Sequence, residues 1–186
     1  MKICPSALAS LASLALLAAA LAGCHGANMS AEPRYVAEAT PAQRAGALDR
    51  VKALAGSWDV MDGNKSEGTI TFTTTAGGSA VREVMFPGSP HEMTNMYTMD
   101  GSDLVMTHYC ASGNQPCMRA KSSTGSSLPF AFDSARDLNS AAESCMGEMT
   151  LEWQSDGRVV EHWSGWEHGA SGPKTIKHDM VLVRRK

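Results

Sequence analysis

The sequence has no internal repeat, no coiled-coil heptads and no apolar run long enough to cross a bilayer. A spanning helix needs about 20 predominantly apolar residues, and the Leu- and Ala-rich stretch from Ala7 to Ala20 is shorter. Positive charge is scarce as well, because 16 Lys and Arg stand against 19 Asp and Glu. A chain without a basic excess lacks the electrostatic footprint of a nucleic-acid-binding protein. We therefore expect neither nucleic acid as a partner nor a membrane-spanning anchor.

Motifs of common catalytic sites are missing too. The chain contains no Gly-x-Ser-x-Gly nucleophile elbow and no glycine loop for phosphate. The segment His91-Glu92-Met93-Thr94-Asn95 begins like the zinc-protease motif H-E-x-x-H, but it ends in Asn and lies where a strand is expected. These absences favour a protein that is not an enzyme, and we predict no catalytic residue.

The N-terminus has the layout of a secretory signal, with one basic residue (Lys2), an apolar stretch and then small residues. The residues Leu21-Ala22-Gly23-Cys24 resemble the lipobox of bacterial lipoproteins. This resemblance implies cleavage before Cys24 and diacylation of its thiol. The alternative interpretation is an ordinary secretory signal followed by an unrelated cysteine.

In the lipoproteins that this sequence resembles, a residue other than Asp after the cysteine, here His25, implies delivery to the outer membrane. We divide the chain into a signal peptide (1–23), a lipid-anchored tether (24–40) and a folded domain (41–186), because residues 26–40 are small, polar and aperiodic. Loss of residues 1–23 removes one basic and no acidic residue, which leaves 15 basic, 19 acidic and a net charge of −4. The predicted partner on the membrane side is therefore the bilayer itself, through the lipid.

The folded domain is predicted to start with one short helix, capped by Thr40, with Pro41 in its first position and Gly56 at its end. From Ser57 onward the apolar residues recur with a period of two, which indicates strands. Turn pairs such as Asp62-Gly63 separate the segments. The expected strands are 58–61, 69–74, 80–86, 93–99, 104–110, 118–121, 128–132, 149–153, 159–166 and 175–184.

Evenly spaced short strands of this kind predict an all-β fold, an antiparallel up-and-down barrel closed on itself so that no edge strand remains. Residues 133–143 contain helix formers without clear periodicity. We expect them to form a loop or a short helix.

The tripeptide Gly56-Ser57-Trp58, between the helix and the first strand, resembles the Gly-x-Trp signature of lipocalin-like (calycin) barrels. Those barrels place an arginine near the end of the last strand, where it stacks on that tryptophan. The resemblance implies this structural role for Trp58 with Arg184 or Arg185. Such a pair is worth about 1–2 kcal/mol when it is partly desolvated.

Further phrases resemble an uncharacterised bacterial family with a calycin-type barrel: Gly77-Gly78-Ser79-Ala80-Val81, Phe86-Pro87-Gly88, His91-Glu92-Met93, Asp100-Gly101 and the run from Thr107 to Pro116. That family has no assigned activity, so the resemblance implies a fold and no reaction. Its pattern has a His before the Met at the start of the strand after the long loop, where this chain has Cys145-Met146. Cys117 is a second departure from the pattern.

Alternation places Glu83, His108 and His178 on apolar strand faces. If these side chains point into the barrel, they are the polar groups that orient a ligand in an apolar cavity. The alternative is that each is a satisfied core or rim residue.

The segment from His108 to Arg119 is predicted to lie at a barrel mouth around a turn at Gly113. Its amides offer donors and acceptors, and its arginine could hold a carboxylate or a phosphate. The alternative is a loop whose amides bond only its own backbone. The complete set of predicted ligand-binding residues is Glu83, His91, His108, Tyr109, Asn114, Gln115, Arg119 and His178.

Three cysteines remain besides Cys4 and Cys24, and an oxidising compartment favours one disulfide and one free thiol among them. We prefer a bond between Cys110 and Cys117, which would clamp the loop. A bond between Cys110 and Cys145 is the alternative. Their spacing fits no familiar zinc site.

Methionine is abundant, with 12 residues in the chain. Met93, Met96 and Met99 cannot converge on a copper(I) ion, because on a strand Met96 faces away from the other two. We expect them instead to supply adaptable apolar lining, and no metal site is predicted.

The sequence thus favours a lipid-anchored periplasmic protein that binds or carries a small apolar or amphipathic molecule. One alternative is a barrel that binds haem or a metal through a lumenal His, for which His108, His162 or His178 would serve. Another is a structural envelope lipoprotein whose barrel is filled with side chains. The ligand, a cofactor and the oligomeric state stay undetermined at this level.

Overall fold

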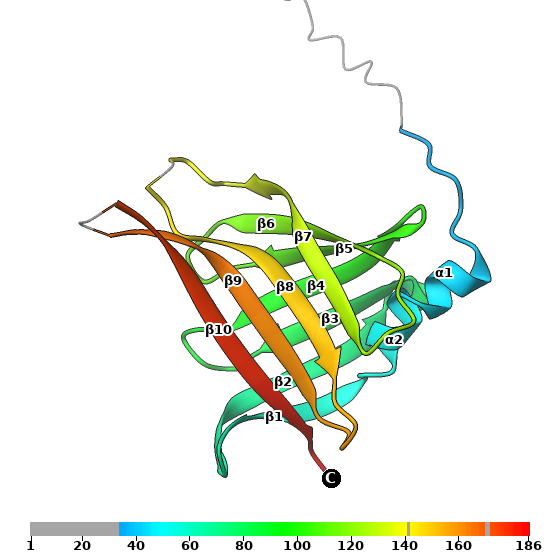
Figure 1. Ribbon diagram of the computed structural model, residues 1–186, viewed down its shortest axis with the longest axis horizontal. Helices are drawn as coiled ribbons and strands as arrows, with labels where there is room; N and C mark the ends of the chain where they lie inside the picture. The colour runs from blue at the N-terminus through cyan, green and yellow to red at the C-terminus, as the bar shows by residue number, and fades with distance from the viewer. Residues whose placement is uncertain (1–33, 141, 170–171) are drawn as a thin grey trace, which may run out of the picture. The chain divides into compact units, whose positions relative to one another are not determined.

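The computed structural model describes residues 34–140, 142–169 and 172–186, and the predicted signal peptide, Cys24 and most of the tether lie outside these described residues. The described chain forms two short α-helices, a single 3-10 turn (Ala76–Gly78) and ten strands (Figure 1). The helices are α1 (Pro41–Ala45) and α2 (Leu48–Lys52). The strands are β1 (Gly56–Asp62), β2 (Lys65–Thr75), β3 (Ala80–Met85), β4 (Met93–Asp100), β5 (Asp103–Tyr109), β6 (Gln115–Lys121), β7 (Ser127–Arg136), β8 (Cys145–Trp153), β9 (Val159–Gly169) and β10 (Gly172–Arg184).

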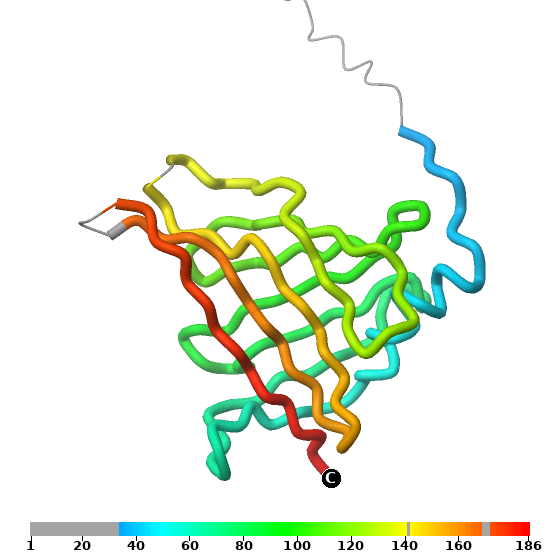
Figure 2. Tube along the Cα trace, in the orientation of Figure 1, coloured from blue at the N-terminus to red at the C-terminus, as the bar shows by residue number. Residues whose placement is uncertain are grey.

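These strands form a closed antiparallel barrel in which each strand pairs with the next and β10 pairs with β1. The trace in Figure 2 follows the chain from strand to strand around this barrel. The predicted fold class is therefore confirmed, and each of the ten expected strands overlaps one that is observed. Closure leaves no free sheet edge, which removes the usual template for aggregation.

One expected loop is a strand. Residues 133–136 continue β7 because Ser134 pairs with Cys117 and Arg136 with Gln115 on β6. The expectation of a loop or helix from residue 133 is wrong for these residues, since strand pairing overrides their local helix preference.

The N-terminal helix is broken into two. Thr40 caps α1 with a capping box: its Oγ1 accepts from the Gln43 amide at 3.2 Å, and Gln43 Oε1 accepts from the Thr40 amide at 2.8 Å. The predicted short N-terminal helix is confirmed over residues 41–52, but it ends at Lys52, and Gly56 already starts β1 with a φ of +121°. The apolar stripe still packs inward, with Leu48 and Val51 buried against the barrel.

Helix α2 closes one end of the barrel. Its Arg50 guanidinium donates to the carbonyls of Ser123, Gly125 and Ser127, all in or beside the β6–β7 loop. The same guanidinium lies 3.9 Å from the ring centroid of Trp153. These contacts tie the helix to strands far along the chain, so this end of the barrel is covered.

Trp58 and Arg184 form the stacking pair expected of a calycin-like barrel. The guanidinium carbon of Arg184 lies 4.3 Å from the Trp58 ring centroid. Its nitrogens donate to the carbonyls of Ala55 at 2.7 Å and Ala53 at 2.9 Å, while the indole of Trp58 donates to Leu54 at 2.8 Å. The pair therefore also supplies partners for carbonyls in the segment after α2.

Replacing Arg184 by Ala should lower the free energy of unfolding by about 1–2 kcal/mol, because it removes both the cation–π contact and two hydrogen bonds. Urea unfolding monitored by tryptophan fluorescence would measure the loss. Arg185→Ala is the matched control, since Arg185 pairs with Asp59 at the surface at 3.1 Å and such pairs contribute little. Equal losses in the two variants would contradict the closing role of Arg184.

Candidate functional site

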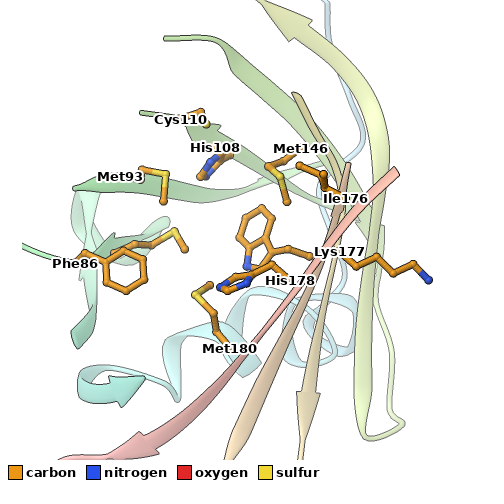
Figure 3. A pocket seen from close by; sticks show the side chains of 11 residues that line it. Phe86, Met93, His108, Cys110, Met146, Ile176, Lys177, His178 and Met180 are labelled. Atoms are coloured by element: carbon orange, nitrogen blue, oxygen red, sulfur yellow. The ribbon is translucent and has the colours of Figure 1, made fainter. Parts of the chain in front are cut away.

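A cavity of about 280 Å³ lies within the barrel near the end opposite α2. Its walls are Met85, Phe86, Met93, His108, Cys110, Met146, Trp163, Ile176, Lys177, His178 and Met180. Met85 ends β3, Met93 begins β4, and His108 lies one residue before the end of β5, so these side chains meet where neighbouring strands turn. Figure 3 shows Met93, His108, Met146 and Met180 arranged around the space, whereas Lys177 points away from it. The cavity is thus apolar, with imidazole and sulfur atoms in its wall.

Below this cavity lies a chain of buried hydrogen bonds that starts at a carboxylate. Glu83 Oε2 accepts from Asn95 Nδ2 at 2.7 Å and from the Tyr97 hydroxyl at 2.6 Å. The amide oxygen of Asn95 lies 2.6 Å from His108 Nδ1. All four residues are buried. Register explains the meeting, because Asn95 on β4 pairs directly with Glu83 on β3 and with His108 on β5.

A second buried carboxyl, Glu161 on β9, faces Glu83. Its Oε2 accepts from the Trp163 indole at 3.0 Å. The Oε1 atoms of Glu83 and Glu161 are both buried, and neither has a hydrogen-bond partner among the described residues. Burial, and then the charge of Glu83, raise the pKa of Glu161 well above its usual range. Burial also raises the pKa of Glu83, although the bonds from Asn95 and Tyr97 oppose this. Both facing carboxyls therefore favour the protonated form more strongly than an exposed glutamate does.

His108 is kept neutral by its surroundings. Burial lowers the pKa of its imidazole to about 4, and its ring lies 5.0 Å from the Trp163 ring, centroid to centroid. Such an environment disfavours the charged form. The imidazole of His108 is therefore uncharged at physiological pH.

The mouth of the cavity is shaped by an unusual backbone at Phe86. This residue has a φ of +54°, which is costly for a residue with a bulky side chain. Its amide donates to the Thr69 carbonyl at 2.8 Å, and its ring lies over Gly68, where a Cβ would stand 2.5 Å from the ring. The missing side chain at Gly68 thus makes room for the aromatic wall of the cavity.

Replacing Gly68 by Val should displace the Phe86 ring, change the cavity wall and cost about 1–3 kcal/mol of stability. The crystal structure of the variant and its unfolding midpoint would test this. Gly125→Val is the control, since Gly125 lies away from the cavity and a Cβ there meets only Ser123 Oγ, at an ordinary 3.7 Å. An unmoved Phe86 ring in the Gly68 variant would contradict this account.

The structure brings only some of the predicted ligand residues to the cavity. Glu83 lies beneath it, His108 lines it, and His178 lines it while remaining exposed to solvent.

The predicted mouth loop does not form the site. Tyr109 is 48% exposed on the opposite strand face. Asn114 is buried but donates to the Ser144 carbonyl at 2.8 Å, and the Gln115 amide bonds the Gly113 carbonyl. The alternative interpretation, amides that bond only the loop's own backbone, holds for Gln115, whereas Asn114 bonds a carbonyl outside the loop and its Oδ1 is buried without a partner in the described part of the chain.

Arg119 and His91 also lie elsewhere. Arg119 is held by Asp100 at 2.9 Å, by Asp103 at 3.5 Å and by Asp133 at 3.5 Å, so it is not available for a ligand in the cavity. His91 lines a different groove, together with Ser57, Thr69 and others.

The disulfide prediction is corrected, because Cys110, Cys117 and Cys145 are all free thiols in the structure. Cys110 lines the cavity, whereas Cys117 lies between the buried residues Pro116 and Met118 and faces the other side of the sheet. Side chains that point apart cannot be bridged. Cys145 is buried, and its burial and the nearby Cys110 raise the pKa of its thiol, but the two are not bonded.

Sequence reasoning missed Asn95, Tyr97, Glu161 and Trp163. Alternation along β9 could have found the last two, because Val159, Glu161 and Trp163 share one buried face. Asn95 carries no such signal, since its importance comes from register with two other strands.

Neither a protein-family model nor a curated protein matches this sequence. Within the described ranges, no group of three or more His, Cys, Asp and Glu side chains is placed to hold a metal ion. In the same part of the chain, no helix is long and apolar enough to span a membrane. The function therefore has to be argued from the cavity itself.

Proposed function

We propose that this chain is a lipid-anchored periplasmic protein that binds or carries a small apolar or amphipathic molecule. The observation that carries the proposal is the cavity of about 280 Å³, which has apolar walls and one oriented, uncharged imidazole. Small-molecule sites in proteins are concave, mostly apolar and furnished with a few placed polar groups. The lipobox-like sequence ending at Cys24 supports the anchored location.

A haem-binding barrel is the second candidate, and His108 is the observation that favours it. Its Nδ1 is bonded to Asn95, so its Nε2 is the atom left to ligate an iron, and the Asn95 bond would fix the orientation of the ring, as is usual for ligating histidines. The cavity volume lies at the lower limit for drug-sized ligands, so a porphyrin would require the mouth to widen. His162 no longer competes, because it is bonded on the outer face by Asp179 at 2.9 Å and Glu152 at 3.0 Å.

A purely structural barrel is the third interpretation, and the cavity argues against it. The cavity is open at the mouth of the barrel and has mainly apolar walls, which is typical of a ligand site and is not needed by a purely structural barrel.

Native mass spectrometry with a UV–visible spectrum tests the proposal. The full chain carrying Cys24→Ser, which cannot be lipidated, would be exported to the periplasm of a host cell and purified without detergent. An additional mass of a small organic molecule supports a carrier, and a Soret band supports haem. A protein that stays free of added mass, and that takes up no molecule from a periplasmic extract or a lipid extract, would overturn the proposal.

A further inference from the structure

The orientation of Asn95 is fixed by its neighbours, and it sets the tautomer of His108. Asn95 Nδ2 donates to Glu83 Oε2 at 2.7 Å and contacts Met85 Sδ at 3.6 Å. The amide oxygen therefore faces His108 Nδ1 at 2.6 Å. An amide oxygen only accepts hydrogen bonds, so the proton of the neutral imidazole is on Nδ1.

The other nitrogen of His108 then carries a lone pair. The ring lines the cavity (Figure 3), and among the hydrogen bonds of the described residues none involves Nε2. Burial keeps the pKa of this imidazole at about 4, so Nε2 remains an acceptor at neutral pH. An acceptor left without a partner in an apolar space costs free energy.

The rest of the site is unfavourable to an anion. Glu83 and Glu161 are the acidic residues beneath His108, and among the described residues neither is paired with a Lys or Arg side chain there. The cationic side chain in the wall, Lys177, is exposed and points away from the cavity. A carboxylate placed at His108 Nε2 would meet a lone pair instead of a donor.

We propose that the cavity selects an uncharged, mainly apolar ligand that donates one O–H or N–H hydrogen bond to His108 Nε2, and that it rejects carboxylic acids in their ionised form. This inference rests on the proposed function and specifies its ligand class as phenols, alcohols and neutral N–H compounds. The flexible methionine side chains of the wall can pack against apolar parts of different ligands. The His108 imidazole accepts the ligand's hydrogen bond. A hydrogen-bonding group without a matching partner is the kind of feature that discriminates strongly between ligands.

Three probes of similar shape separate the possibilities: 1-naphthol, 1-methylnaphthalene and 1-naphthoate. Their binding to the full chain carrying Cys24→Ser would be measured by equilibrium dialysis at pH 7.5. We expect 1-naphthol to bind about tenfold more tightly than 1-methylnaphthalene, the effect of about one net hydrogen bond, and 1-naphthoate to bind most weakly. His108→Phe should abolish the preference for naphthol over methylnaphthalene. His162→Phe is the control, because His162 lies outside the cavity on the outer face, where it is bonded to Asp179 and Glu152, and it should keep the preference.

The comparison of probes in the unaltered cavity stands even if His108→Phe fails to fold. Equal affinities for 1-naphthol and 1-methylnaphthalene, tighter binding of 1-naphthoate, or no binding of any probe would each overturn the donor rule. Those results would leave the proposed function to be decided by the molecule found in native mass spectra. An empty protein in those spectra that nevertheless prefers 1-naphthol would support the donor rule and refute the periplasmic carrier.

Discussion

Replacing Asn95 by Leu is expected to destabilise the barrel by about 2–5 kcal/mol, the cost of two lost hydrogen bonds whose remaining groups stay buried. The amide both donates to Glu83 and accepts from His108. Leu has a similar size but makes neither bond, so Glu83 would keep only the Tyr97 hydroxyl and His108 Nδ1 would lose its partner. Urea unfolding at pH 7.5 would measure the change.

Asn114→Leu is the matched control for this variant. Asn114 is also a buried asparagine, but it donates only one bond, to the Ser144 carbonyl at 2.8 Å. Loss of one neutral hydrogen bond costs about 1 kcal/mol. If both substitutions lowered the free energy of unfolding equally, the hydrogen bonds from Glu83 to His108 would stabilise the fold no more than the single bond of Asn114.

Glu161→Gln is expected to stabilise the protein by about 1–3 kcal/mol near pH 8 and to change little near pH 4. A Gln side chain reproduces the protonated Glu161, because its oxygen accepts from the Trp163 indole and its NH₂ group faces Glu83. At pH 8 the wild-type protein must bind a proton at Glu161 when it folds, because the unfolded glutamate is ionised, and this lowers its stability. The Gln variant does not have this cost.

The sign of this pH dependence follows from the raised pKa of Glu161. An unfolded Glu loses its proton near pH 4.3, while the folded one retains it to higher pH. Between these two values the native state binds more protons than the unfolded state, so stability falls as the pH rises. The raised pKa of Glu83 acts in the same direction.

Thermal and urea unfolding between pH 4 and pH 9 would test the second prediction. Glu148→Gln is the control, because Glu148 is an exposed carboxyl on β8 that accepts from Ser164 at 2.8 Å. Its substitution should leave the pH profile unchanged. An unaltered pH profile in Glu161→Gln, or a loss of stability at pH 8, would refute the assignment of the proton to Glu161.

The barrel was predictable because its signals are local. A period of two and Gly-containing turns specify strands and hairpins, and closure follows from the need to cover edges. The same alternation assigned Glu83 and His108 to an inner face, and both are buried. What alternation cannot give is register, and the hydrogen bonds of Asn95 depend on it.

The prediction for the loop at the barrel mouth failed for Arg119, because closeness in sequence was taken for closeness in space. Arg119 follows the turn at Gly113 by only six positions in the sequence, and we placed it at the mouth for that reason. In an extended strand, however, six residues span about 20 Å. Arg119 therefore lies far along β6, where it meets Asp100 and Asp133.

The central claim is that the cavity presents an uncharged imidazole whose Nε2 is a free acceptor. Long-range ¹⁵N–¹H NMR of the six histidines, with His108 assigned through its Phe variant, tests it most directly. We predict a protonated Nδ1 and an unprotonated Nε2 that persist from pH 8 down to about pH 5, and an Nε2 signal that shifts when 1-naphthol is added. A proton on Nε2, or titration of this ring near pH 6.5, the ordinary value, would contradict the account.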